Sequence, residues 1–308
     1  MREITINKND CGQRLDKFLT KFMPLLPKSM LYKGLRKNCV RINGKHVKDG
    51  GVFLNEGDVL NLYFNDEFFG GGKKFIPISH SLDIVYEDEN LIIVNKPSGI
   101  SVHTDDKGEK RTLIAEIQSY LYAKGEYRPE SEQSFAPALC NRLDKNTSGL
   151  IIAAKNAEAL RIINEKIKNR EIRKFYLCVA EGHMKKSGTL SAYLTRLDKR
   201  VSVSDTLSDG AKPVKLKYTV IGENEKHSLV EVELLTGRTH QIRAQFAHIG
   251  HPLAGDVKYG GSRSPSYQEL ISRRLVFDFK SDAGILNYMT GSDFSIPAEF
   301  SETFSSTN

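Results

Sequence analysis

The segment CNRLDKNTSGLIIAAKN, residues 140–156, contains side chains that could carry out chemistry. Asp144 lies between the cations Arg142 and Lys145, and small polar residues and then an apolar run follow it. Neighbouring positive charges favour the ionised form of a carboxyl group, so Asp144 would be available as a nucleophile or an electrostatic partner at neutral pH. Such a carboxylate is suited to attack on an electron-poor carbon.

Asp144 also has a simpler interpretation. An aspartate among Asn, Thr, Ser and Gly residues is commonly a turn residue or a helix cap, because its carboxylate accepts hydrogen bonds from nearby backbone amides. The residue types alone leave the structural and the catalytic interpretations open.

The longer stretch ALCNRLDKNTSGLIIAAKN resembles the catalytic-loop motif of the RluA branch of pseudouridine synthases, commonly His-Arg-Leu-Asp-x-x-Thr-Ser-Gly-Leu. The positions that match are Arg142, Leu143, Asp144, Thr147, Ser148, Gly149 and Leu150. Asn141 stands where that family commonly has histidine. Its amide can still form hydrogen bonds, but it cannot supply a titrating imidazole.

Two further blocks resemble the same family in the expected order. RKFYLCVAEG places Tyr176 at the family's active-site tyrosine, with Cys178 in place of a small residue. LLTGRTHQIRAQFAHIGHPLAGDVKYG places Ile242 and Arg243 at the positions that contact the target base and pair with the aspartate. QELISRRLVFDF is a looser match to the family's last strand, and the resemblance as a whole extends over nearly the entire chain.

The resemblance implies that the protein isomerises uridine to pseudouridine in RNA without a cofactor. This reaction breaks a carbon–nitrogen bond, turns the uracil and rejoins it through ring carbon five. A glycosidase usually needs two carboxylates, one of them to protonate the leaving group or activate water. Here the detached base is the returning reactant, so one aspartate, Asp144, would suffice.

The resemblance also assigns roles to the other site residues. The target base must leave its stack before any protein group can reach it. Arg142 would fill the vacated place, and Tyr176 would stack on the ring and remove the proton from carbon five. Arg243 would project from a helix with a buried stripe of Ile242, Phe246 and Ile249, and would orient Asp144.

The elements that must position these residues form a strand-rich pattern from about residue 80. The short apolar or alternating segments are LDIVYED, NLIIVNKP, LIIAAK, RKFYLCVAE, LKYTVIG and SLVEVELL. A helix is predicted from Asn156, as its cap, through Leu160, Ile163 and Ile167 to about Arg170. Adjacent strands without intervening helices favour an α+β domain, with a largely antiparallel mixed sheet and flanking helices, over residues 80–308.

A smaller α+β lobe is predicted over residues 10–64. Leu15, Phe18, Leu19 and Phe22 have the spacing of a helix with one buried face, which prolines 24 and 27 would end. A second helix would follow, capped by Ser29 and with Leu31 and Leu35 facing the core. Lys33, Arg36 and Lys37 would then lie on its opposite side. Asn43-Gly44 predicts a two-residue hairpin turn, and VLNLYF predicts a closing strand.

This lobe carries most of the excess positive charge. Residues 1–64 contain 12 Lys and Arg against 6 Asp and Glu, a net +6 within a chain of net charge +7. PKSMLYKGLRKNCVRINGKHV resembles the alpha-L RNA-binding module, so we expect RNA contacts through Lys33, Arg36 and Lys37. Within the family, this lobe most resembles enzymes that modify 23S ribosomal RNA. The alternative is a small lobe whose lysines only keep it soluble. Residues 65–79, with three consecutive glycines, predict a flexible linker.

The composition indicates an ordinary globular protein. The chain has 308 residues, 39% hydrophobic residues and a mean hydropathy of −0.39. Its N-terminus lacks a signal-peptide pattern and no apolar run is long enough to cross a bilayer, so we expect a cytoplasmic location and no membrane association. The four cysteines form no C-x-x-C pair and are predicted to be reduced. The histidines lack metal-site spacing, so we predict no metal, and we expect a monomer.

Two other functions remain open from the sequence. A catalytically silent RNA-binding or ribosome-assembly protein would use only the N-terminal lobe. A base-releasing glycosylase would use the same Asp144 but would leave free uracil and an abasic site.

Overall fold

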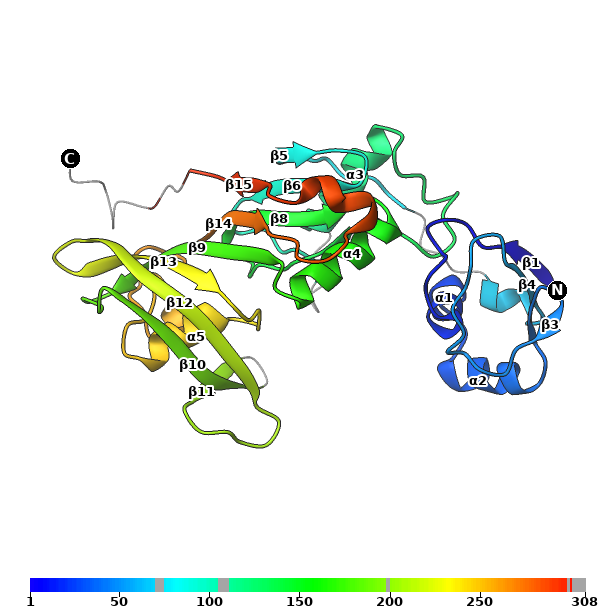
Figure 1. The fold of residues 1–308 in the computed structure, drawn as a ribbon, viewed down its shortest axis with the longest axis horizontal. Coiled ribbons are helices and arrows are strands. Elements are labelled where there is room, and N and C mark those ends of the chain that lie inside the picture. The colour runs from blue at the N-terminus through cyan, green and yellow to red at the C-terminus, as the bar shows by residue number, and fades with distance from the viewer. Residues whose placement is uncertain (70–74, 105–110, 198–199, 298–299, 301–308) are drawn as a thin grey trace. The chain divides into compact units, whose positions relative to one another are not determined.

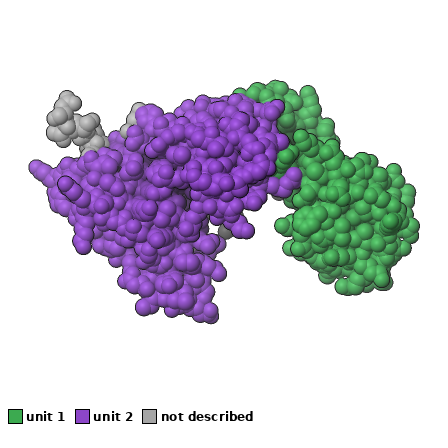
Figure 2. All heavy atoms as spheres, in the orientation of Figure 1, with its two compact units in different colours: residues 1–79, 118–137, 155–158 green, residues 80–117, 138–154, 159–308 purple. Residues whose placement is uncertain are grey.

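The computed structural model describes residues 1–69, 75–104, 111–197, 200–297 and 300. The contacts of the chain divide it into two compact units (Figure 2). Unit 1 comprises residues 1–79, 118–137 and 155–158, and unit 2 comprises residues 80–117, 138–154 and 159–308. Residues 70–72, the glycines of the predicted linker, lie outside the described part of the chain.

Unit 1 contains a four-stranded antiparallel sheet in the order β1-β4-β2-β3 (Figure 1). Its elements are β1 (Arg2–Thr5), α1 (Leu15–Phe22), α2 (Lys28–Arg36), β2 (Val40–Ile42), β3 (Lys45–His46), β4 (Val59–Leu62) and the short 3-10 helix η1 (Asp66–Phe69). The apolar stripe of α1 is buried, as predicted, through Leu15, Phe18 and Leu19. Strand β1 belongs to this sheet although it precedes residue 10, the predicted start of the lobe.

Most of the predicted local features of unit 1 are confirmed. Asn43 and Gly44 have φ angles of 50° and 76°, as a two-residue hairpin turn between β2 and β3 requires. The prediction that Ser29 caps α2 is wrong, because the helix begins at Lys28 and the capping position is Pro27. Proline has a φ fixed near the helical value and carries no backbone N–H that would need an acceptor. It can therefore precede the first turn without a side-chain cap.

The exposed face of α2 is cationic. Leu31 and Leu35 are buried in the core, whereas Lys33, Arg36 and Lys37 are all exposed. The predicted separation of apolar and basic faces on this helix is therefore confirmed.

Unit 2 is built on an eleven-stranded mixed sheet. Its main path is β11-β10-β12-β13-β9-β14-β8-β6-β5, with β15 paired to β14 and β7 paired to β8. The strands are β5 (Asp83–Glu87), β6 (Leu91–Lys96), β7 (Ala138–Leu139), β8 (Ser148–Ala154), β9 (Ile172–Glu181), β10 (Ser187–Arg196), β11 (Val201–Ser204), β12 (Lys212–Glu223), β13 (His227–Leu234), β14 (Leu270–Phe277) and β15 (Asp293–Ser295). Among the described strands, only β8 and β14 pair in parallel, which confirms the predicted α+β class.

The described helices that follow residue 80 are few and short. They are α3 (Leu113–Ala123), α4 (Ala157–Lys168), α5 (Gln241–His248) and the 3-10 helices η2 (Val257–Tyr259) and η3 (Gly284–Met289). None of the helices in the described ranges is long and apolar enough to cross a membrane.

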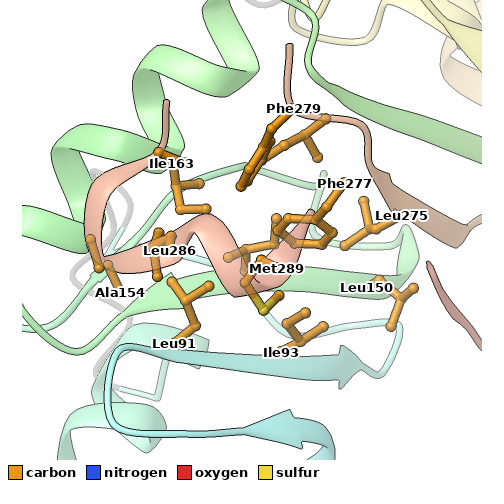
Figure 3. Close-up of a cluster of buried hydrophobic side chains, with 14 of the residues drawn as sticks. Leu91, Ile93, Leu150, Ala154, Ile163, Leu275, Phe277, Phe279, Leu286 and Met289 are labelled. Carbon is orange, nitrogen blue, oxygen red and sulfur yellow. The ribbon is translucent and has the colours of Figure 1, made fainter. Parts of the chain in front are cut away.

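A hydrophobic cluster holds α4 and η3 against the sheet (Figure 3). Ile163 of α4 and Leu286 and Met289 of η3 pack with Leu91 of β6 and Phe277 of β14, and all five side chains are buried. The adjacent pair β8 and β14 is thereby fixed in position, and β8 is the strand that directly follows Asp144.

The sheet order explains why three distant sequence blocks meet. Asp144 precedes β8, Tyr176 lies on β9, and α5 follows β13, and these strands lie within the path β13-β9-β14-β8. Gly149 permits the close approach of β8 to β14: it has a φ of 111°, and a Cβ there would lie 2.3 Å from the carbonyl oxygen of Ser272. A larger residue would separate the two strands beside the Asp144 loop.

Candidate active site

The three sequence blocks line one cavity of about 310 Å³. Asp144 contributes a carboxylate whose side chain is 24% exposed, so its oxygens are open to a ligand that enters the cavity. The other predicted site residues of unit 2 also line it: Arg142, Tyr176, Ile242 and Arg243. The structure thus brings together the residues that the sequence pattern selected.

Arg243 connects two carboxylates through separate nitrogens. Its Nη1 atom donates to Oδ2 of Asp144 at 2.7 Å. Its Nε and Nη2 atoms donate to the two oxygens of Asp256 at 2.7 and 2.8 Å. This fork geometry fixes the guanidinium plane and therefore the direction from which it holds Asp144. Burial alone would lower the pKa of Arg243, but the two carboxylates raise it well above the usual value.

Asp256 is a site residue that the sequence analysis missed. It lies inside the third sequence block but was assigned no role, although a buried arginine requires a buried anion. Its side chain is 1% exposed and belongs to the loop after α5. The preceding Gly255, with a φ of 77°, allows that loop to pass against the backbone of Tyr267.

The position of Arg243 on α5 differs from the prediction. Ile242 and Phe246 are buried as expected, but Ile249 lies beyond the end of the helix and is 37% exposed. Arg243 itself is only 7% exposed. A stripe argument assumes that one face of a helix meets solvent, whereas this short helix is enclosed on several sides, and its buried cation is balanced by acids.

His240 also lies close to Asp144 and lines the same cavity. It adopts a left-handed backbone conformation immediately before α5. Its Nδ1 atom hydrogen-bonds the Tyr259 hydroxyl at 2.8 Å, and its Nε2 atom lies 3.8 Å from Oδ2 of Asp144. Burial lowers the pKa of His240, an effect that Asp144 opposes. His248 and His251 contact other groups, Asp205 and the Glu181 carbonyl.

Tyr176 projects into the cavity from the central strand β9 and is 5% exposed. Burial raises the pKa of its hydroxyl to about 12, and the negative charge of Asp144 contributes to that rise. A hydrogen bond with the Ser272 side chain opposes the shift. Tyr176 is therefore a neutral phenol at physiological pH.

The residues flanking Asp144 divide into exposed and structural groups. Arg142 is exposed and lines the cavity, without an ion pair to any described residue. Asn141 is buried, and its amide bridges to β8: Oδ1 accepts from the backbone amide of Ile152 at 2.8 Å, and Nδ2 donates to Leu150 at 3.4 Å. The prediction that Asn141 would still form hydrogen bonds is confirmed.

Lys96 holds the loop that carries Asp144 through hydrogen bonds to backbone carbonyls. Lys96 was assigned no role from the sequence. Its buried ammonium donates to the backbone carbonyls of Pro97, Ile100 and Lys145 at 2.8, 2.9 and 2.9 Å. Burial lowers the pKa of Lys96 to about 8, and Asp144 opposes this shift. Because Lys145 directly follows Asp144, the ammonium restrains the backbone that carries the carboxylate.

Comparison with protein families gives two matches along the chain. The RNA pseudouridylate synthase family matches residues 90–248, and the S4 domain matches residues 13–60. The first match includes Asp144, Tyr176 and Arg243, and the second includes the cationic helix α2.

Several curated proteins are similar over most of their length. An uncharacterized RNA pseudouridine synthase of Mycoplasma capricolum is 30% identical over 94% of this chain and 95% of the relative. Ribosomal large subunit pseudouridine synthase D of Escherichia coli is 34% identical over 85% of this chain and 77% of that protein. Ribosomal large subunit pseudouridine synthase C of Vibrio vulnificus is 33% identical over 86% and 82%, respectively.

A solved structure shares the fold. Human RNA pseudouridylate synthase domain containing 1 superposes with a TM-score of 0.56 at 23% identity, covering 72% of this chain and 86% of the human one. Because the cavity, the sequence matches and the relatives agree, the chain belongs to the RNA pseudouridylate synthase family, in its RluA branch, and carries an N-terminal S4 domain.

Proposed function

We propose that the protein isomerises specific uridines of large-subunit ribosomal RNA, with Asp144 as the nucleophile. Family membership supports the reaction, and the names of the relatives from Escherichia coli and Vibrio vulnificus support the RNA class. The observation that carries the assignment of the nucleophile is the asymmetric environment of Asp144. Arg243 holds Oδ2, whereas Oδ1 accepts no hydrogen bond from any described residue and belongs to a side chain that lines the cavity.

This environment suits a displacement reaction. An oxygen of Asp144 attacks the anomeric carbon of the extruded uridine, and the bond to ring nitrogen one breaks with its electron pair moving onto uracil. After the base turns, carbon five bonds to the anomeric carbon and the carboxylate leaves. Carbon five then loses its proton, and nitrogen one gains a proton. Attack on the uracil ring in place of the anomeric carbon is the alternative first step, because both centres are electrophilic.

The surrounding residues have complementary roles in this proposal. Arg142, exposed at the cavity, occupies the place that the target base leaves in the RNA. Ile242 and the ring of Tyr176 form apolar walls against the uracil. In this proposal Tyr176 also accepts the proton from carbon five. Arg243, which donates to Oδ2 of Asp144, stabilises that carboxylate as a leaving group.

The N-terminal lobe supplies affinity in this proposal. The lobe over residues 10–64 binds RNA through Lys33, Arg36 and Lys37, and residues 65–79 connect it to the catalytic domain, residues 80–308. We expect the enzyme to act as a monomer in the cytoplasm.

The test uses the equal masses of uridine and pseudouridine, which make a chemical label necessary. Ribosomal RNA from cells with and without the gene is treated with carbodiimide and read by primer extension. We expect one or more stops that disappear on deletion and return with the normal protein. Asp144→Ala should restore none, and Asp144→Asn, which keeps the shape of the side chain, should also restore none.

Other outcomes support the rival functions. Unchanged stops in the deletion strain, or full restoration by Asp144→Asn, would indicate an RNA-binding or assembly role without chemistry. Release of free uracil with an abasic site in purified reactions would indicate a glycosylase.

A further inference from the structure

Lys174 is a cavity residue that the proposed reaction does not use. It lies on β9 two residues before Tyr176, and residues at this spacing on a strand project from the same face. It lines the cavity together with Ile167, Leu234 and Gly237. A Cβ atom added at Gly237 would lie 3.5 Å from Nζ of Lys174. The ammonium is thus adjacent to the loop that leads from β13 to α5.

The charge of Lys174 is not balanced within the described part of the protein. No hydrogen bond or ion pair connects its ammonium to any described residue, although its neighbour Arg173 pairs with Glu233 at 2.8 Å on the opposite face of β9. Burial lowers the pKa of Lys174. An ammonium that is partly removed from water without a partner is unfavourable, so its presence indicates that a ligand supplies the anion.

The chemistry of the substrate identifies this anion. In RNA the anionic groups are the backbone phosphates, whereas uracil and ribose are neutral before the reaction. Lysine is a compact charge that binds phosphate without strict orientation. We propose that Lys174 contacts a phosphate adjoining the target uridine and so fixes the extruded nucleotide in the cavity. This inference rests on the proposed function, because it needs RNA with its target nucleotide at Asp144.

The experiment replaces phosphates individually by uncharged methylphosphonates. The probe is a short RNA containing the uridine found by primer extension, with one methylphosphonate at each of the phosphates around it in turn. Dissociation constants are measured in the Asp144→Asn background, so that binding is separated from turnover. We expect one methylphosphonate position to weaken binding by about 10- to 100-fold, the usual effect of losing a charged hydrogen bond.

Variants at position 174 identify the protein partner of that phosphate. Lys174→Met should weaken binding of unmodified RNA by a similar factor, and the sensitive methylphosphonate should then cause no further loss. Lys174→Arg, which keeps the charge, should restore the sensitivity. Lys226→Met removes an exposed lysine on the turn between β12 and β13 and should leave the sensitivity unchanged. Thermal melting of each variant confirms that the fold is retained.

The possible failures are distinguishable. If Lys174→Met and every methylphosphonate act additively, Lys174 does not contact a phosphate and the inference is overturned. Normal binding by Lys174→Met with reduced turnover would also overturn it and would indicate a contact to the uracil carbonyls. If the protein with Asp144 intact forms no pseudouridine in the unmodified RNA, the proposed function itself fails.

Discussion

One guanidinium determines how the Asp144 carboxylate is presented. Arg243 uses one nitrogen for Asp144 and two for Asp256, so the proposed nucleophile is held at a single oxygen, whereas Asp256 is held at both of its oxygens. A bidentate hold on Asp144 itself would occupy both oxygens and compete with attack. The arrangement combines orientation with an available lone pair, which a carboxylate nucleophile requires.

Tyr176 is in the opposite protonation state to the one a base needs. With a pKa near 12 in the folded protein, only about one molecule in 10⁵ has the phenolate at pH 7. Before the reaction, the neutral phenol of Tyr176 can therefore stack on a base and form hydrogen bonds. If Tyr176 is the base, as we propose, its phenolate must form after the uracil has become detached. The two contributions are separable, because phenylalanine retains the ring and removes the hydroxyl.

The buried hydroxyl of Tyr176 also makes stability depend on pH. The unfolded tyrosine ionises at about pH 10, whereas the folded one ionises at about 12, so the unfolded protein binds fewer protons between these values. The contribution of the neutral Tyr176 hydroxyl to the free energy of unfolding is therefore complete below pH 10 and is lost as the pH rises toward 12. Urea unfolding should show that the stability advantage of the wild type over Tyr176→Phe falls by about 1 kcal/mol from pH 8 to pH 11.

A matched substitution shows whether this effect is specific. Tyr267 is 52% exposed, so Tyr267→Phe should unfold in parallel with the wild type over the same pH range. An advantage over Tyr176→Phe that stays constant up to pH 11 would contradict burial as the cause of the raised pKa.

At the scale of elements, much of the fold was predictable from the sequence. The apolar or alternating segments at β5, β6, β8, β9, β12 and β13 were identified because burial leaves a period of two or an unbroken apolar run. Strand β10, SGTLSAYLTR, was not predicted, because its small and hydroxyl-bearing residues form no clear alternation of apolar and polar side chains. The short α3, with its central residues apolar on several sides, likewise lacked a clear polar face.

The site residues, too, could be predicted only in part from the sequence. Asp144, Tyr176 and Arg243 were found because they lie in motifs that resemble a known family. Asp256 and Lys96 were missed because their importance arises from burial, which a linear sequence does not display. In the sequence, Lys96 is an ordinary lysine at the end of an apolar strand. Only the structure reveals the three backbone carbonyls around its ammonium.

Asp256 connects α5 to the following loop, so we predict a combined effect on stability and activity. Asp256→Asn leaves Arg243 buried with half of its anionic partners removed, which should destabilise the fold by about 3–5 kcal/mol. The freed guanidinium should also misplace Asp144, lowering kcat about 100-fold. Chemical unfolding measures the first effect, and pseudouridine formation well below the melting temperature measures the second.

Asp205→Asn provides the comparison for this substitution. Asp205 contacts His248 at 3.1 Å, but its side chain is 81% exposed. Exposed ion pairs contribute little to stability, so stability and kcat should stay near the wild-type values. Equal effects of the two substitutions would show that Asp256 has no special role in positioning Arg243.

At the scale of the whole molecule, charge and chemistry are separated along the sequence. Residues 1–64 contain a net +6 of the total +7, while the residues that we propose to be catalytic all lie beyond residue 140. A cationic helix without a catalytic group can increase affinity for a polyanion without distinguishing one uridine from another. Selection of the target must then depend on the catalytic cavity and on the shape of the RNA around it.

This separation predicts how salt affects binding. Replacing Lys33, Arg36 and Lys37 together by alanine should weaken RNA binding and make the slope of log affinity against log salt shallower by about 2–3, since each lost phosphate contact releases fewer counterions. Because Lys33 and Arg36 are exposed on α2 and Lys37 is exposed at its C-cap, the fold should be retained. Filter binding of a ribosomal RNA fragment from 50 to 300 mM salt, roughly the range in which phosphate contacts dominate, gives the slope.

The matched variant removes the same charge from the other unit. Lys185, Lys186 and Lys226 are exposed at the turns beside β10 and between β12 and β13, and replacing them by alanine also lowers the net charge by three. If the α2 lysines and arginine contact phosphates, only their replacement changes the slope strongly. If both triple variants shift the slope equally, RNA responds to net charge alone and α2 is not a specific contact surface. With saturating RNA, kcat should be unchanged in the α2 variant, because its residues supply affinity and take no part in the bond changes at Asp144.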